Sequence, residues 1–296
     1  MSPQVTPEDK KQIVESAVKE ISHIATLPEV TVKIIELVED PNSTAQDLHK
    51  VISNDPALCS RILKVVNSAF YGLPGQIGSI NRAIVLLGLN AVKNIAIAAS
   101  LSKLYRGGQL SPEFSAKDLW VHSVSTAAAA KLIADAMKLG LPDEAFLAGL
   151  IHDIGLIVEM QHDRQKLIDV VERLEVKGGV PSKNMLEVEE QIFGATHQDF
   201  GRALCERWKF PKSFSYVTGS HHDPMELSAG NRTLACVIHV ADRLAAGVEE
   251  AGFRLDLDSL EVNQSVLEEL GLSRDQLESI REQLPQHIED VKHLMS

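Results

Sequence analysis

Two adjacent residues, His152 and Asp153, give this 296-residue chain its first sign of chemistry. They lie in the segment GLIHDIG (149–155), whose apolar residues predict a buried helix. An imidazole buried beside a carboxylate needs strong partners, because an unpaired buried charge is very costly. A divalent first-row metal ion would satisfy both groups, since imidazole nitrogen and carboxylate oxygen are ligands for such ions. The alternative is a histidine that donates to a backbone carbonyl beside an aspartate that caps a helix.

Other residues able to bind a metal recur along the chain, in apolar helix-forming sequence or at its edge. They are His122, His197, the adjacent pair His221 and His222, and Asp242. Ligand side chains on successive buried helices are what a metal site inside a helical bundle requires. The pattern therefore indicates a metal site more strongly than His152 and Asp153 do alone.

The elements that must position these residues are predicted to be helices. Asp55-Pro56 is typical of an N-cap followed by proline at the first helical position, and Ser79 and Gly88 bracket a second helix. Ser273 and Gln276 fit a capping box before an apolar stripe of helical spacing. Alternation of period two is scarce, so we expect an all-α protein with at most one sheet of two short strands.

The main shift in composition is the segment RGGQLSP (106–112), which predicts a boundary between two helical lobes. We expect an N-terminal helical lobe over residues 1–108 and a second lobe with the candidate metal site over residues 109–296. The segment from Ile84 to Leu101 is too apolar to stay exposed, so the lobes are expected to pack together.

The net charge of the chain limits the classes of molecule that it is expected to bind. Lysine and arginine total 29 against 41 aspartates and glutamates, a formal charge of −12. This charge argues against nucleic acid or an anionic membrane as the main partner. The longest apolar run, Ile95–Leu101, is too short to cross a bilayer, and the polar N-terminus is unlike a secretory signal. Cys59, Cys205 and Cys236 form no CxxC motif, so we expect a reducing, cytoplasmic location without zinc–cysteine or disulfide sites.

The order of the histidines and aspartates resembles the HD superfamily of metal-dependent phosphohydrolases, and the closer likeness is to its HDOD branch. The HDOD likeness rests on IATLP (24–28), LKVVNSAFYG (63–72), residues 77–88, residues 148–155 and residues 197–222. It extends from about Ile21 to at least His222, with the Asp242 motif of the HD superfamily beyond it. HDOD domains look like signalling modules, and many have lost metal ligands that this chain retains.

The resemblance implies a role for each candidate residue. His122, His152, Asp153 and Asp242 would bind one ion, while His197 and His221, with His222 as a further candidate, would hold a second. The ion would be iron, manganese, nickel or zinc. Imidazole and carboxylate ligands without thiolate bind all four and do not distinguish among them. Asp153 would be the catalytic residue of an enzyme, bridging the ions or orienting water.

Two functions stay open at this point. The first is a regulatory module that binds metal and acts through protein partners of a signalling pathway. The alternative is a phosphohydrolase acting on a phosphodiester or phosphomonoester, and a small phosphorylated or nucleotide ligand is a further candidate. The resemblance to active HD-GYP phosphodiesterases is incomplete, because Leu156 replaces their lysine and Asp223-Pro224 follows the histidine pair without Gly-Tyr-Pro. The N-terminal lobe, which hydrolysis does not need, favours the module.

Overall fold

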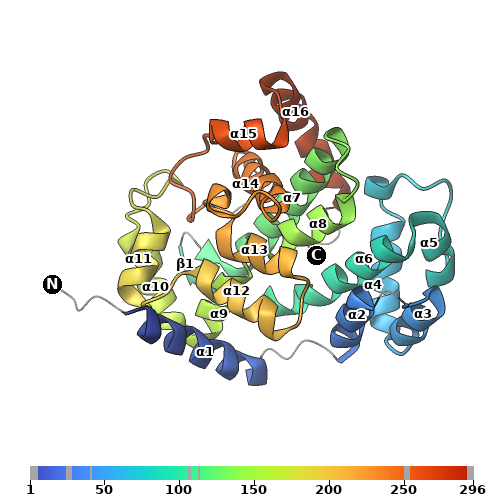
Figure 1. Ribbon diagram of the computed structural model, residues 1–296, viewed down its shortest axis with the longest axis horizontal. Coiled ribbons are helices and arrows are strands. Elements are labelled where there is room, and N and C mark those ends of the chain that lie inside the picture. Colours follow the sequence, from blue (N-terminus) through green and yellow to red (C-terminus); the bar gives the residue numbers. More distant parts are fainter. Residues whose placement is uncertain are drawn as a thin grey trace.

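The computed structural model describes residues 6–24, 29–40, 42–105, 108–112, 114–249 and 254–291 (Figure 1). Within these ranges the chain is mainly helical, and its strands form one antiparallel pair. The all-α class and the limit of two short strands are therefore confirmed. Residues 106 and 107, which begin the predicted boundary, and the IATLP residues 25–28 lie outside the described ranges.

The first group of helices packs around one central helix, α6. Helix α6 contacts each of the other four helices of this group, and its residues from Ala91 to Leu101 are all buried. This burial agrees with the apolar composition of the segment on every side. The helices of the group are α2 (Glu29–Glu39), α3 (Ala45–Ser53), α4 (Pro56–Val66), α5 (Ile80–Leu87) and α6 (Leu89–Leu101).

The expected helix boundaries are present. The side chain of Asp55 accepts a hydrogen bond from the backbone N–H of Leu58 at 2.9 Å, with Pro56 at the first position of α4. Ser79 caps the start of α5, and Gly88 follows its end with a φ of 90°. These caps satisfy backbone groups that have no partner within the helix.

The second group of helices follows a short hairpin and contains the candidate site. Helix α7 packs against α8 and α14, and α12 packs against α9 and α13. Helix α8 also contacts α6, so the two groups pack together as expected. The elements are β1 (Gln109–Ser111), β2 (Phe114–Ser115), α7 (Ala116–Ala136), α8 (Pro142–Ile151), α9 (Ile154–His162), α10 (Arg164–Arg173), α11 (Met185–Ile192), α12 (His197–Arg207), α13 (Lys212–Ser220), α14 (Thr233–Ala246) and the 3₁₀ turn η3 (Pro224–Glu226). The 3₁₀ turns η1 (Ala69–Tyr71) and η2 (Ser102–Tyr105) belong to the first group.

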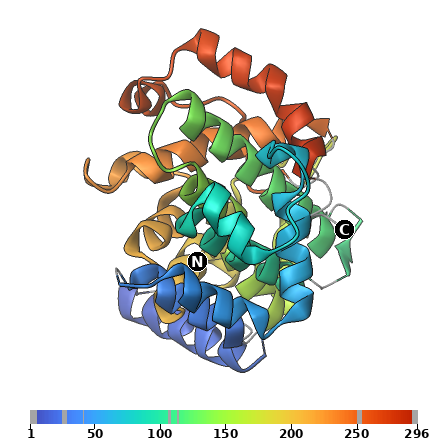
Figure 2. The ribbon, with the colours of Figure 1, turned by 90° about the vertical axis from the view of Figure 1, so that its right-hand side faces the viewer.

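The first helix, α1 (Pro7–Ile24), lies against the second group rather than the first. It contacts α9 and α12, and Figures 1 and 2 show it running along the edge of the molecule beneath them. Its buried face consists of Val14, Ala17, Val18 and Ile21. The division of the chain at residue 108 into two domains stays a prediction.

The last described helices connect the two groups. Helix α15 (Gln264–Leu270) packs on α14, and α16 (Arg274–Val291) contacts both α7 and η1. The predicted capping box precedes α16: the N–H of Gln276 donates to Ser273 Oγ at 3.2 Å, and the N–H of Ser273 donates to Gln276 Oε1 at 3.0 Å. None of the helices in the described ranges combines the length and apolar character needed to cross a bilayer.

Candidate metal centre

His152 and Asp153 form the turn between α8 and α9, where two glycines allow close packing. His152 follows the last residue of α8, and Asp153 precedes the first residue of α9. A β-carbon at Gly149 would lie 2.7 Å from the Cα atom of Ala127 on α7. A β-carbon at Gly155 would lie 1.8 Å from the carbonyl oxygen of His197. Both distances are far shorter than real contacts allow, so the glycines let α7 and α12 approach the turn.

The structure brings all the predicted site residues into one buried cluster. His122 lies in the second turn of α7, His197 is the first residue of α12, and Asp242 lies in α14. His221 and His222 directly follow α13. Six of the seven have 0% exposure, and His222 is 8% exposed. The six are His122, His152, Asp153, His197, His221 and Asp242.

One half of the cluster lies between α7, α14 and the turn after α8. His122 Nε2 lies 3.0 Å from Asp242 Oδ1, and His152 Nε2 lies 3.2 Å from Asp153 Oδ2. His152 Nε2 also lies 3.8 Å from Asp242 Oδ1. His122, His152 and Asp153 each offer a ligand atom within 4.8 Å of the others.

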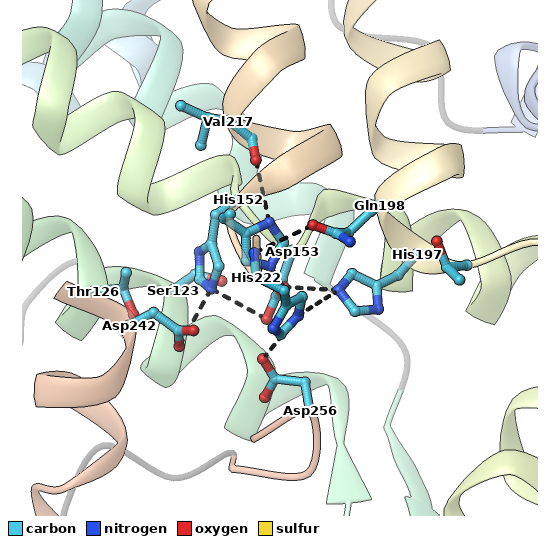
Figure 3. Close-up of polar contacts among 12 residues, drawn as sticks. Ser123, Thr126, His152, Asp153, His197, Gln198, Val217, His222, Asp242 and Asp256 are labelled. Carbon is cyan, nitrogen blue, oxygen red and sulfur yellow. Dashed lines mark hydrogen bonds and ion pairs between the residues drawn. The ribbon is translucent and has the colours of Figure 1, made fainter. Parts of the chain in front are cut away.

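The other half lies between α12, α13 and the same turn (Figure 3). Asp153 Oδ1 is 3.3 Å from His221 Nε2 and 3.7 Å from His197 Nε2. His197 Nε2 and His222 Nε2 are 3.1 Å apart. Asp153 therefore presents one carboxylate oxygen to each half of the cluster, as a residue shared by two ions would.

The outer nitrogens of two histidines fix which way their rings face. His152 Nδ1 donates to the carbonyl oxygen of Gly149 at 2.7 Å, and His221 Nδ1 donates to that of Val217 at 3.2 Å. A carbonyl oxygen can only accept, so Nδ1 carries the proton and Nε2 faces the centre of the cluster. Metal-binding histidines commonly have this arrangement, with the second ring nitrogen held by an acceptor.

Comparison with known proteins identifies the family. The model of the HDOD domain matches residues 24–224, more than half of the chain. The chain belongs to the HDOD domain family. A curated but uncharacterised protein of Treponema pallidum (strain Nichols) is 25% identical over 213 residues, which cover 72% of this chain and 40% of that protein. The chain thus spans less than half the length of this relative.

Solved structures share the HDOD fold along most of this chain. An HDOD domain protein of unknown function from Geobacter sulfurreducens has a TM-score of 0.76 at 23% identity, covering 96% of this chain and 98% of that one. A protein from Shewanella amazonensis SB2B, proposed to be a phosphohydrolase, has a TM-score of 0.72 at 21% identity, covering 96% and 98%. A proposed signal transduction protein from Marinobacter aquaeolei VT8 has a TM-score of 0.76 at 22% identity, covering 97% of this chain and 65% of that one. At these identities the likeness establishes the fold alone.

Several buried atoms of this HDOD centre fit a divalent metal. Neither oxygen of Asp153, nor Nε2 of His152 or His221, has a hydrogen-bond partner among the described residues. Ligand atoms around one ion at about 2.1 Å lie roughly 3 Å from one another, as several of these atoms do. These atoms lie 3.2 and 3.3 Å apart in pairs without forming hydrogen bonds, so they converge on a common point rather than on one another. The residues therefore fit one or two divalent ions, and their imidazole and carboxylate ligands suit iron, manganese, nickel or zinc.

Burial and the neighbouring carboxylates act in opposite directions on the pKa values of two histidines in the cluster. Burial alone would lower the pKa of His152, but the carboxylates of Asp153 and Asp242 raise it to about 10. Burial likewise opposes protonation of His197, but Glu189 and Asp153 raise its pKa to about 9. The metal-free centre therefore holds protons at neutral pH where a metal ion would supply the positive charge.

The two remaining histidines of the second half behave in the opposite way. Burial lowers the pKa of His221, and burial together with His221 and His197 lowers the pKa of His222 well below its usual value. These two imidazoles are neutral at pH 7 and so already have a lone pair available for a metal.

Glu189 of α11 supports His197 and was absent from the residues predicted from the sequence. Its carboxylate accepts the backbone N–H of His197 at 2.9 Å and lies 2.9 Å from His197 Nδ1. Glu189 is fully buried although α11 carries acidic residues along its length. Its burial is the only signal that separates it from Glu187 and Glu190, and the sequence does not display it.

Asp256 is the second residue that sequence reasoning missed. It lies in the stretch between α14 and α15, and Figure 3 shows it pointing toward His222. Its Oδ2 atom is 3.7 Å from His222 Nε2. Burial, followed by the charges of Asp153 and Asp242, raises the pKa of Asp256 well above its usual value.

Proposed function

We propose that this HDOD protein is a regulatory module that holds one or two divalent ions and passes a signal to protein partners. The observation that carries the proposal is the burial of the candidate ligands, six of which have 0% exposure. A catalytic metal keeps a position open for water or substrate, whereas a structural metal is enclosed by protein. The fold likeness to a proposed signal transduction protein agrees with this function.

The surroundings of the centre also favour a module over a hydrolase. A cavity of about 250 Å³ reaches His222 and His239, and its lining includes the acidic residues Asp223 and Glu226. Negative side chains at an entrance repel a phosphate ester, so this cavity is poorly suited to admit one. Neutral or cationic species, including a metal ion, would enter more readily.

The centre is directly connected to the N-terminal helices. Helix α8, which ends at the metal-binding turn, packs on α6. The hydroxyl of Tyr105, in the η2 turn after α6, donates to the carbonyl oxygen of Leu150 at 3.2 Å. Leu150 is two residues before His152, so a shift of the turn on metal binding would reach the N-terminal helices through this contact.

A metal-dependent phosphohydrolase remains the second candidate, because Asp153 faces both halves of the centre. Two bound ions would lower the pKa of a bound water and polarise a phosphoryl group. Against this candidate stands Leu156, which is fully buried where HD-GYP enzymes have lysine. The fold likeness to a proposed phosphohydrolase does not by itself assign the activity to this chain.

Metal analysis beside a hydrolysis assay separates the two candidates. The purified chain would be loaded anaerobically with iron, manganese, nickel or zinc, and its metal content and its turnover of bis(p-nitrophenyl) phosphate measured. The same measurements on Asp153→Asn, with Asp258→Asn at an exposed aspartate as control, attribute each result to the centre. Bound metal without turnover supports the module, while turnover that Asp153→Asn abolishes supports the enzyme. A wild type without stoichiometric metal after every loading contradicts both.

Hydrogen exchange tests the signalling step itself. We expect metal loading to slow amide exchange in α8 and also in α6 and η2, because Tyr105 connects them. Tyr105→Phe should reduce the response of α6 while leaving the response of the metal-binding turn intact. A response confined to α8 and α9 in the wild type would contradict transmission to the N-terminal helices.

A further inference from the structure

Asp256 is a buried acid with no role in the motif that identifies the centre. Its side chain has 0% exposure, and neither of its oxygens has a hydrogen-bond partner among the described residues. A carboxylate taken out of water without a partner is very costly, so the fold must gain something by placing it there.

The position of Asp256 relative to the other ligand atoms suggests that the gain is metal binding. One ligand atom of Asp256 lies within 4.8 Å of those of Asp153 and His221. Another such group, with the same limit, joins Asp256 to His222 and Asp242. Asp256 thus adds a third carboxylate to a centre that already contains two, and three neighbouring carboxylates favour bound cations.

The nearby arginine does not neutralise Asp256. Arg243 donates through Nε to the carbonyl oxygen of Glu261 at 3.2 Å, and its Nη1 donates to the carbonyl oxygen of His239 at 3.2 Å. Among the described residues this guanidinium forms its ion pair with Asp242, whose Oδ2 lies 3.9 Å from Nη1. Arg243 therefore ties the stretch that carries Asp256 to α14, and the Asp256 carboxyl faces the centre with no lysine or arginine paired to it among the described residues.

The residues on each side of Asp256 hold it in this orientation. Leu255 and Leu257 are buried at 3% and 2% exposure, so the backbone is anchored on both sides of the acid. Asp258, two residues later, is exposed. An acid that is anchored on both sides and faces inward is arranged as a ligand rather than as a solvating charge.

We propose that Asp256 is a ligand of the ion held by the half of the centre formed by His197, His221 and His222. This inference rests on the proposed metal-binding function and specifies it further. A carboxylate from outside the His-Asp motif would fill a coordination position that a hydrolase leaves to water or phosphate. Metal binding would then also fix the stretch that leads to α15 and α16.

The test compares Asp256→Asn with Asp258→Asn, its exposed neighbour on the same stretch. We expect the wild type and Asp258→Asn to bind manganese or zinc with the same stoichiometry and affinity. We expect Asp256→Asn to bind one ion fewer, or to bind the weaker ion at least about tenfold less tightly, as loss of a metal-supporting carboxylate does. Metal content by mass spectrometry and competition with a chelating dye measure these quantities.

A second readout does not depend on affinity. Metal loading of the wild type should slow hydrogen exchange over residues 254–263, and this slowing should be absent in Asp256→Asn. Circular dichroism of the metal-free variant checks its folding, and Asp256→Ser replaces it if the asparagine form is not folded. If the folded variant and the wild type have equal metal content, affinity and hydrogen exchange, the inference about Asp256 is overturned, while the proposed metal binding of the protein still stands. A wild type that binds no metal would instead overturn the proposed function.

Discussion

Gly155 and the backbone of His197 are in closer contact than any other residue type at position 155 would permit. A β-carbon there would lie 1.8 Å from the carbonyl oxygen of His197 and 2.6 Å from its carbonyl carbon. Both neighbouring atoms belong to the backbone of α12, so they cannot move aside as a flexible side chain would. The distance between the two halves of the candidate metal centre therefore depends on the absence of a side chain at this position.

Replacing Gly155 with alanine should separate α9 from α12. We expect the free energy of unfolding to fall by about 3 kcal/mol or more, at or beyond the upper end of ordinary overpacking effects. Metal content should fall as well, because His197 would move away from Asp153. Chemical denaturation and metal analysis measure both effects. Gly230→Ala is the control, since a β-carbon there meets nothing within 4 Å, and a comparable loss in that variant would contradict the explanation.

Metal binding should release protons and strengthen as the pH rises. The pKa values of about 10 for His152 and about 9 for His197 mean that both imidazoles carry an extra proton at pH 7.5. Coordination requires the neutral imidazole, so metal displaces these protons, and affinity should increase between about pH 7 and the higher of these values. Calorimetry in buffers of different ionisation enthalpy counts the protons. An affinity independent of pH over this range would contradict the assignment of these histidines as ligands.

Glu189→Gln should weaken metal binding without unfolding the protein. The glutamate accepts both the backbone N–H and Nδ1–H of His197, whereas glutamine has a single acceptor oxygen and an amide group that cannot accept. We expect a loss of affinity of about 10- to 100-fold, as is typical for groups that orient a ligand. Glu187→Gln, on the same helix but outside this contact, should bind metal like the wild type. Equal affinities for the two variants would show that Glu189 has no role in orienting His197.

Asp199 should stabilise the protein above about pH 4 and cease to do so in acid. Burial alone would raise its pKa, but the backbone N–H of Thr196 and the ammonium of Lys10 lower it below the usual 3.8. A depressed pKa gives stability that is present above the unfolded value and is lost as pH falls through the folded value. Asp199→Asn should therefore cost about 1 kcal/mol at pH 7, a typical value for a lost cap. The difference from wild type should vanish in acid, and urea titrations at several pH values measure it. A difference that persists unchanged to pH 2 would be inconsistent with this origin.

Much of the architecture follows from local signals in the sequence. Asp55-Pro56, Ser79 and the pair Ser273 and Gln276 cap helices where their side-chain chemistry predicts. The recurrence of candidate ligands in apolar helix-forming sequence or at its edge, together with the HD resemblance, also predicts one buried cluster. Local chemistry of this kind is readable because it acts within three or four residues along the chain.

The residues that were missed depend on contacts that are distant in the sequence. In the sequence, Asp256 of Leu255-Asp256-Leu257 has the pattern of an ordinary surface acid. Only its position beside His222 in the fold distinguishes it from other acidic residues. Glu189 is one of several acids on α11 and is distinguished solely by its contact with His197. Similarly, the apolar face of α1 predicts that the helix is covered but not that α9 and α12 cover it. Burial by distant elements has no local pattern to reveal it.

The position of α1 has a consequence for the synthesis of the chain. Its apolar face, which includes Val14, Val18 and Ile21, is buried against α9 and α12, and α12 ends only at Arg207. At about 5–20 residues per second, α1 must wait on the order of ten seconds or more before α12 has been made. During that interval its apolar face is available to chaperones or to a neighbouring nascent chain. Helix α1 therefore reaches its native partners only long after its own residues have been synthesised.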